Sequence, residues 1–199
     1  MRNAAALPEG EINLTHHLTS IIASIVKHSP SLAHIDVGKV LVCIGSNRSG
    51  RRGGLYGKLI PLRFENGTEI VRYRGRYYTL PAISHNGADC LYIIYFYMPR
   101  FFDLPWNEKL RVIFHELYHI SPRFDGDIRR MGAVKTAHGH SKKHFDSLYA
   151  DELKAFSDYI RVTPAMNLLD MNTGALYRRY RKVTGVRMKS PKPVLLDHK

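Results

Sequence analysis

The segment VIFHELYHISPRFDGDIRR, residues 112–130, contains two histidines four positions apart, with a glutamate directly after the first. Side chains four apart on a helix project from the same face, so His115 and His119 can place imidazole nitrogens on one cation at about 2.0–2.1 Å. Glu116 is displaced from that face and could reach a water molecule on the same metal. The pattern His-Glu-x-x-His therefore predicts a zinc (Zn2+) site for hydrolysis, with Glu116 as the general base.

The residues around the motif favour a packed helix over a chance occurrence. A helical pattern covers roughly residues 105–120, with Pro105 near its first turn and Pro122 beyond its end. Apolar side chains recur on it at core positions, namely Leu110, Ile113, Phe114, Leu117 and Ile120. The alternatives are a buried helix whose histidines hydrogen-bond locally and a solvent-facing histidine pair.

A catalytic zinc usually has three protein ligands and one open position, so a third ligand is needed. Downstream, residues 138–144 (HGHSKKH) contain three histidines after a glycine-containing connection. His140 is the preferred ligand because it directly precedes Ser141, a good N-cap residue where a helix could begin. His138, in the same loop, is the competing ligand. Glu152 is the acidic alternative.

The rest of the chain predicts an α+β fold with a small mixed β-sheet. It divides into an N-terminal helical part at 1–36, a metallopeptidase domain at 37–162 and a basic C-terminal extension at 163–199. The patterns predict two long helices, at 11–28 and 141–160, and short helical pieces near 167–171 and 175–183. They also predict strands at 39–45 and 90–98 and β-rich stretches at 55–64 and 68–83, with a turn at 65–67 and a hairpin through 74–76. The tail is expected to be extended.

Composition narrows the class of protein. Hydrophobic residues make up 44% of the chain, enough for a core, and no stretch approaches the ~20 apolar residues of a membrane span. No secretory signal is recognisable at the N-terminus. Cys43 and Cys90 form no CxxC pair, lie in apolar strand patterns and exclude a disulfide framework. We expect a cytoplasmic protein with no membrane partner.

The net charge of +13 suggests a polyanionic partner or simple solubility. Basic residues concentrate in the glycine-rich loop 45–58 and in the C-terminal extension, which we expect to be the surfaces for any nucleic acid. The sequence shows no aromatic residues interleaved with these charges in a known binding motif, so charge alone does not identify the ligand.

The runs HELYHI and FDG, followed later by HGHSKKHFD, resemble a family of phage-type metallopeptidases related to SprT-like zincins. The resemblance covers roughly residues 37–160 and implies a zincin-like fold. It also implies zinc ligands at His115, His119 and His140, with Glu116 as general base and an aromatic residue, Phe145, five positions after the third ligand. The extended metzincin pattern is absent because Asp125 stands where its third histidine would be, and the cysteine-rich ribbon of some SprT-like proteins is absent too.

Further side chains could assist such a site. Tyr149 could polarise a substrate carbonyl, whereas Tyr118 is expected to pack in the core. Asp125 and Asp146 could each accept a hydrogen bond from a ligand imidazole, and the spacing does not select between them. An edge strand beside the active-site helix could bind substrate backbone by strand addition.

The predicted function is therefore a zinc metallopeptidase acting on protein or peptide substrates. The alternative is a nucleic-acid-binding protein with a structural or vestigial zinc site. A third interpretation joins the two, a protease that acts on nucleic-acid-bound proteins.

Overall fold

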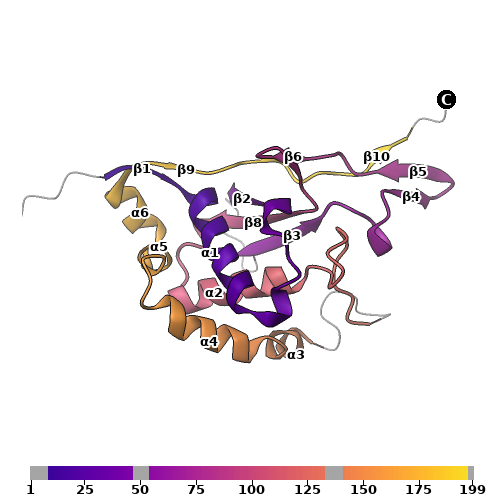
Figure 1. Ribbon diagram of the computed structural model, residues 1–199. Helices are drawn as coiled ribbons and strands as arrows, with labels where there is room; N and C mark the ends of the chain where they lie inside the picture. The colour runs from indigo at the N-terminus through magenta and orange to yellow at the C-terminus, as the bar shows by residue number, and fades with distance from the viewer. Residues whose placement is uncertain (1–8, 47–53, 133–140, 197–199) are drawn as a thin grey trace, which may run out of the picture.

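The computed structural model describes residues 9–46, 54–132 and 141–196, and a three-stranded mixed sheet lies at its centre (Figure 1). The middle strand is β8 (Tyr92–Met98), with β2 (Val40–Ser46) parallel on one side and β3 (Gly57–Pro61) antiparallel on the other. Six of the seven residues of β8 are buried, which explains its nearly continuous apolar sequence YIIYFYM. β2 and β3 are the two outer strands of this sheet.

The main helices pack against the sheet and against one another. α1 (Leu14–His28) contacts β2, and α2 (Trp106–Tyr118) contacts β3. α3 (Lys142–Ser147) and α4 (Ala150–Ile160) follow, and α4 contacts both α1 and α2. One hydrophobic core joins these elements, and it includes Ile22, Phe96, Phe114, Phe156 and Leu176. Across the described ranges, no helix has the length and apolarity needed to span a bilayer.

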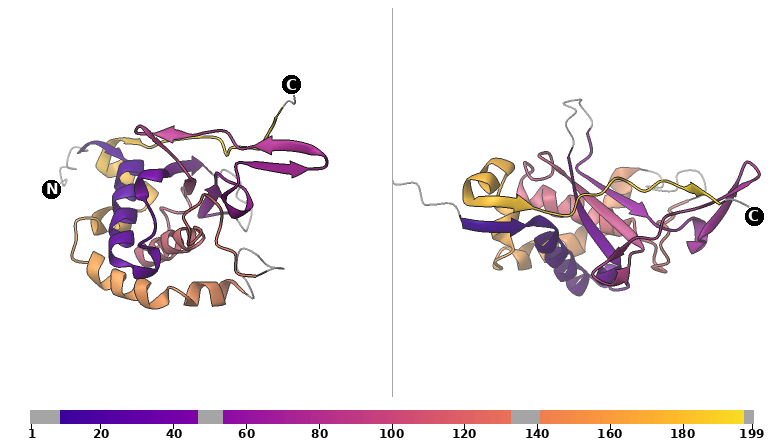
Figure 2. Two further views of the ribbon diagram at one scale, coloured as in Figure 1. Left: turned by 45° about the vertical axis from the view of Figure 1, so that its right-hand side comes forward. Right: turned by 90° about the horizontal axis from the view of Figure 1, so that it is seen from above.

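The remaining strands form smaller sheets at the periphery. β1 (Glu9–Asn13) pairs in parallel with β9 (Tyr180–Thr184), and β6 (Ser84–His85) pairs with β7 (Ala88–Asp89). The third sheet has the order β10-β5-β4 and extends beyond the helices (Figure 2). Its strands are β4 (Ile70–Tyr73), β5 (Arg76–Thr79) and β10 (Val194–Leu195). The short helical elements are η1 (Pro30–Leu32), η2 (Val37–Lys39), η3 (Glu65–Gly67), α5 (Met166–Asp170) and α6 (Thr173–Arg179).

The predicted α+β class is confirmed, as are the hairpin and the turn at 65–67. Arg74 and Gly75 have φ values of 50° and 79°, the positive pair that a two-residue hairpin turn requires. Cys43 and Cys90 are both buried free thiols; Cys43 lies in β2 as expected, whereas Cys90 precedes β8.

Two element predictions were wrong. The single helix expected at 141–160 is two helices, because Tyr149 has a non-helical backbone (φ −122°, ψ 12°) and directs its ring into the core. The helix expected at 175–183 ends at Arg179, and the chain continues as β9 because its backbone pairs with β1.

Candidate metal centre

The end of α2 brings the two motif histidines together. His115 lies in the last turn, and His119 is the C-cap residue with helical backbone angles (φ −72°, ψ −16°). The two Nε2 atoms are 3.1 Å apart, and the rings are nearly perpendicular. Two ligand nitrogens on a tetrahedral zinc, each at 2.0–2.1 Å, would be about 3.3–3.4 Å apart. The pair therefore fits two ligand positions of such an ion.

Asp146 of α3 orients the first imidazole. Its Oδ1 lies 2.8 Å from His115 Nδ1, with the His115 side chain 13% exposed. An imidazole that donates from Nδ1 to a carboxylate presents the lone pair of Nε2, which is the atom that faces His119. Burial alone raises the pKa of Asp146, but hydrogen bonds from Lys142, Tyr149 and His115 outweigh it and hold that pKa below its usual value. Asp146 is thus an anionic partner for a motif histidine.

Phe145 packs against both imidazole rings. Its side chain is fully buried and stacks on His119, with ring centroids 4.6 Å apart and planes 25° apart. It meets His115 edge-on at 5.1 Å. The helix that carries it begins at Ser141, whose side chain accepts a hydrogen bond from the His144 backbone N–H, as an N-cap does. The start of α3 is therefore anchored beside the histidine pair.

Glu116 faces the central sheet. Its side chain is buried, and its Oε2 accepts a hydrogen bond of 2.8 Å from the Leu59 backbone N–H of β3. A Cβ added at Gly57 would lie 2.9 Å from Glu116 Oε1 and 2.9 Å from Val112 Cγ1, so a glycine is needed for this close approach. Burial raises the pKa of Glu116 to about 7, although the Leu59 N–H and Lys142 act to lower it. A carboxylate with this pKa is suited to exchange protons near neutral pH.

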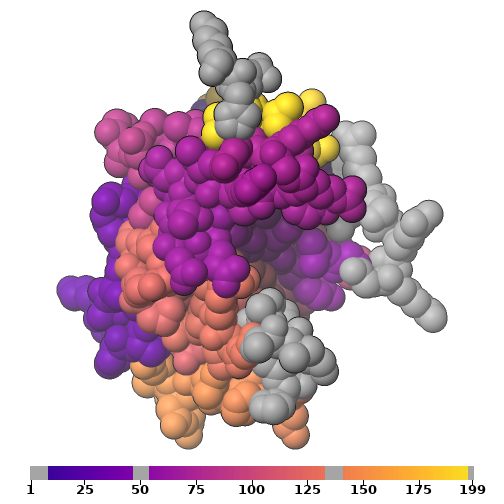
Figure 3. All heavy atoms as spheres, turned by 90° about the vertical axis from the view of Figure 1, so that its right-hand side faces the viewer, coloured from indigo at the N-terminus to yellow at the C-terminus, as the bar shows by residue number. Residues whose placement is uncertain are grey.

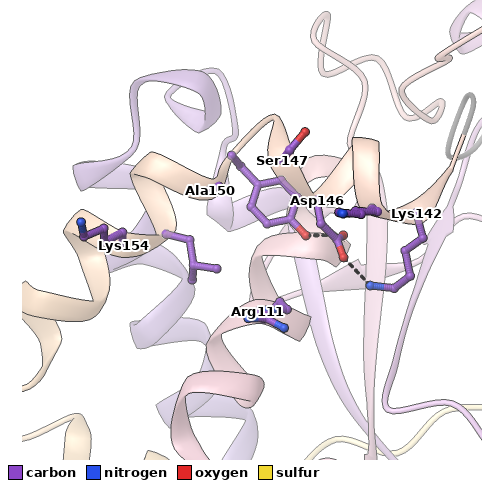
Figure 4. Close-up of a pocket in the computed structure, with 9 residues that line it drawn as sticks. Arg111, Lys142, Asp146, Ser147, Ala150 and Lys154 are labelled. Carbon is purple, nitrogen blue, oxygen red and sulfur yellow. Dashed lines mark hydrogen bonds and ion pairs between the residues drawn. The ribbon is translucent and has the colours of Figure 1, made fainter.

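A cavity of about 460 Å³ opens beside these groups. Its lining includes His115, Glu116, Gly57, Val112, Arg111 and Lys142. A second recess, of about 590 Å³, lies behind Asp146 and shares Arg111 and Lys142 with the first. Figure 4 shows this recess, with Lys142 reaching the Asp146 carboxylate. Cationic side chains therefore border the space next to the motif.

Comparison with known proteins identifies the family of the chain. A family model described as "Putative phage metallopeptidase" matches residues 13–178. The chain belongs to this family. No curated protein and no solved structure matches it. The name of this metallopeptidase family states the class of activity, hydrolysis of peptide bonds with a metal, and the matched range contains the whole histidine motif.

The sequence predicts the third metal ligand at His140, with His138 as the competing residue. His140 and His138 fall outside the described residues, so their assignment stays a prediction. The carboxylate of Glu152, the acidic alternative, accepts hydrogen bonds from the backbone N–H and the hydroxyl of Ser31, at 3.0 and 2.7 Å. Within residues 9–46, 54–132 and 141–196, no three His, Cys, Asp or Glu side chains are gathered so that they could hold a metal.

The structure also separates the assisting candidates. Asp146, not Asp125, contacts a motif histidine, and Asp125 instead pairs with Arg123 at 2.9 Å. Tyr149 is buried, and its hydroxyl donates to Asp146 at 2.7 Å, so it supports that carboxylate rather than reaching a substrate carbonyl. Tyr118 packs in the core, as expected.

Sequence reasoning did not find the Leu59 contact with Glu116, which depends on a backbone group and leaves no side-chain signal. The sequence contained a partial signal for Asp146. Lys142 stands four residues before it, a spacing at which oppositely charged side chains pair on a helix.

Proposed function

We propose that the protein is a zinc-dependent metallopeptidase in which His115, His119 and His140 hold the ion and Glu116 is the general base. The observation that carries this proposal is the pair of Nε2 atoms 3.1 Å apart, one of them on a ring held through its other nitrogen by Asp146. Carboxylate–histidine–zinc arrangements are a regular feature of zinc sites, because the carboxylate sets the tautomer and raises the basicity of the ligand.

His140 is supported as the third ligand by its place in the chain. It directly precedes Ser141, and successive Cα atoms are only ~3.8 Å apart. The helix that Ser141 caps sends Phe145 onto both motif rings. The chain thus enters α3 close to the histidine pair. This favours His140 over His138, which stands two residues further from Ser141 in the sequence.

Zinc bound there would lower the pKa of a coordinated water and polarise the scissile carbonyl. Glu116 would accept the proton that this water loses and deliver it to the leaving amine. The Leu59 N–H fixes the Glu116 carboxylate through a hydrogen bond to Oε2. Burial of Glu116 raises the pKa of this carboxylate to about 7, so that Glu116 can both accept and release a proton.

The outer strand β3 is suited to hold the substrate backbone. It is paired with β8 along one side, and on its other side the Leu59 N–H already meets Glu116. A peptide extended along this outer side would lie next to the general base and the histidine pair, as strand addition requires. The sequence predicted such an edge strand without indicating which it is, and β3 is our assignment.

The test measures zinc content and proteolysis together. Purified wild type should contain close to one zinc per chain and cleave a denatured protein such as casein. Glu116→Gln should keep the zinc and lose cleavage by about 10²-fold or more, as for the loss of a general base. The control Glu69→Gln, at an exposed residue paired with Arg63, should retain both zinc and activity.

The third ligand is tested by a matched pair of substitutions. His140→Ala should lose zinc, whereas His138→Ala should keep it. Equal retention by both variants would refute the assignment of His140. If the wild type bound zinc stoichiometrically but cleaved no protein, the structural-zinc alternative would replace a peptidase function.

A further inference from the structure

The projecting sheet β10-β5-β4 gathers basic residues from two distant parts of the chain. Residues 70–79 supply β4 and β5, and residues 187–195 supply β10 and the segment before it. Neither stretch contains an aspartate or a glutamate. Together they carry six exposed cations. Arg72, Arg74 and Arg76 belong to the β4–β5 hairpin and Lys192 precedes β10, whereas Arg187 and Lys189 line a recess beside the central sheet. Within the described residues, none of the six forms an ion pair, so their charge is not neutralised locally.

Tyrosines alternate with the arginines on this sheet. The strand register sets Arg72 opposite Tyr77 and Tyr73 opposite Arg76, so each face of the hairpin presents one arginine beside one tyrosine. Tyr73 is 56% exposed. The guanidinium of Arg74 lies 5.2 Å from the Tyr73 ring centroid, and that of Arg72 lies 5.9 Å from the Tyr77 ring centroid. The sheet thus combines positive charge with the exposed aromatic side chain of Tyr73.

The sheet lies apart from α2 and α3, the helices that carry His115 and Asp146. Figure 1 shows β4 and β5 beyond the end of the central sheet, and in Figure 3, seen from that side, the purple atoms of this part of the chain lie at the front of the molecule. A long polymer could therefore lie along the sheet without entering the cavity beside Glu116.

We propose that this sheet, which we call the arginine–tyrosine sheet, binds single-stranded nucleic acid. Arginines neutralise phosphates and release counterions, and tyrosines provide faces on which unpaired bases stack. An acidic protein would also meet the cations, and binding of polyglutamate tests for that alternative. Duplex DNA keeps its bases stacked and would leave the tyrosine faces unused. This binding surface is independent of the peptidase proposal, since it uses none of the same residues.

The experiment measures the affinity of the full chain for a fluorescent oligothymidylate as a function of salt. Wild type should bind at low salt, and the triple variant Arg72→Ala, Arg74→Ala, Arg76→Ala should bind at least about tenfold more weakly. Its slope of log affinity against log salt should be less negative by about 2, since each phosphate contact to a single strand contributes about 0.7. The matched control, Lys27→Ala, Lys39→Ala, Lys154→Ala, removes the same charge from exposed lysines elsewhere and should bind nearly as well as wild type.

A second variant tests stacking separately from charge. Tyr73→Leu keeps the net charge and should weaken binding about 5- to 100-fold, the range found for loss of one base–aromatic stack. Absence of wild-type binding at low salt, or equal loss in the arginine and lysine triple variants, would overturn the proposal. Binding of polyglutamate as tight as that of the oligonucleotide would show a general polyanion surface and would also overturn it. Tighter binding of duplex, with no effect of Tyr73→Leu, would refute the single-stranded ligand.

Discussion

The end of α2 and the arginine–tyrosine sheet both combine charged and aromatic side chains, but they hold them differently. Beside α2, Asp146 and Glu116 are partly or fully buried, and each meets a directed partner. On the sheet, the arginines are exposed and have no acidic partner within the described residues. Buried charges require fixed hydrogen-bond partners, whereas exposed charges remain hydrated and available to a ligand. Substitutions in the first region should therefore change stability, metal binding or proteolysis, and those in the second should change none of these.

The largest expected effect belongs to Phe145→Ala. Removing this fully buried ring should lower the free energy of unfolding by about 3–5 kcal/mol and should also weaken zinc binding, because both imidazoles lose the surface they rest on. Urea denaturation and zinc content measure the two effects.

Phe156→Ala provides the matched control for this change. Phe156 is equally buried, and its ring packs on those of Phe114 and Tyr159. Its loss should lower stability by a similar amount and leave zinc content unchanged. A similar loss of zinc in both variants would show that Phe145 acts only through general stability.

Gly57→Ala should have the next largest effect. The new methyl group would meet Glu116 Oε1 and Val112 Cγ1 at 2.9 Å, which should cost about 1–3 kcal/mol of stability and shift β3 away from the general base. Proteolysis should fall while zinc content stays near that of wild type. The control is Gly10→Ala in β1, where an added Cβ meets no atom within 4 Å. Unchanged proteolysis in Gly57→Ala would show that the close approach of β3 to Glu116 is not required.

Local patterns predicted much of the fold but few of the contacts between its elements. The apolar spacing along α2 and the continuous apolar run of β8 mark a helix and a strand, because their own residues determine those patterns. The motif also predicted which face carries His115 and His119. By contrast, Asp146 is 31 positions from His115, and the Leu59 N–H that holds Glu116 is 57 positions away. Such pairs depend on how the elements pack, and no local spacing encodes them.

The same limit explains the wrong elements. Residues 180–184 have a helix-compatible pattern, yet they form β9 because their backbone pairs with that of β1, about 170 positions earlier. Likewise, the arginines and tyrosines of 72–78 were visible as letters, but their alternation on two faces follows from the register of the hairpin.

Asp146→Asn should weaken zinc binding about 10- to 100-fold, the usual effect of losing a carboxylate that supports a ligand histidine. The asparagine keeps the size of the side chain but cannot stabilise the imidazole as an anion does. A competition titration with a chelator measures the affinity. Asp151→Asn, at an exposed acidic residue in the first turn of α4, is the control and should bind zinc as wild type does. Equal affinities for the two variants would remove Asp146 from the support of the site.

The buried Lys109 of α2 predicts a pH dependence of stability. Its ammonium group donates hydrogen bonds to the carbonyls of Leu169 and Met171, both at 2.7 Å. Burial lowers the pKa of Lys109 from the ordinary value of 10.5 to about 8, although Asp170 and Asp103 oppose that change. Between these two pH values Lys109 holds more protons in the unfolded chain than in the folded one, so this group makes the free energy of unfolding rise with pH, by at most about 1.4 kcal/mol per pH unit. The buried thiols of Cys43 and Cys90 and the hydroxyl of Tyr92, whose pKa values burial raises, contribute in the opposite direction. The effect of Lys109 is therefore the difference in slope between matched variants.

Chemical denaturation at a series of pH values from 8 to 10 measures this slope. The slope should be less positive in Lys109→Met than in wild type, whereas Lys154→Met, at an exposed lysine of α4, should keep the wild-type slope. Equal slopes in wild type and Lys109→Met would contradict the assignment of the effect to Lys109.

The smallest effect on stability is expected where the effect on binding is largest. The exposed arginines Arg72, Arg74 and Arg76 have no acidic partner within the described residues, so replacing all three with alanine should change the free energy of unfolding by only about 0.5 kcal/mol per site or less. Zinc content and proteolysis of casein should remain those of wild type, because the sheet shares no residue with the cavity beside Glu116. A loss of stability comparable to that of Phe145→Ala would show that these guanidinium groups stabilise the hairpin. Their role would then be structural, and they would not be explained by ligand binding.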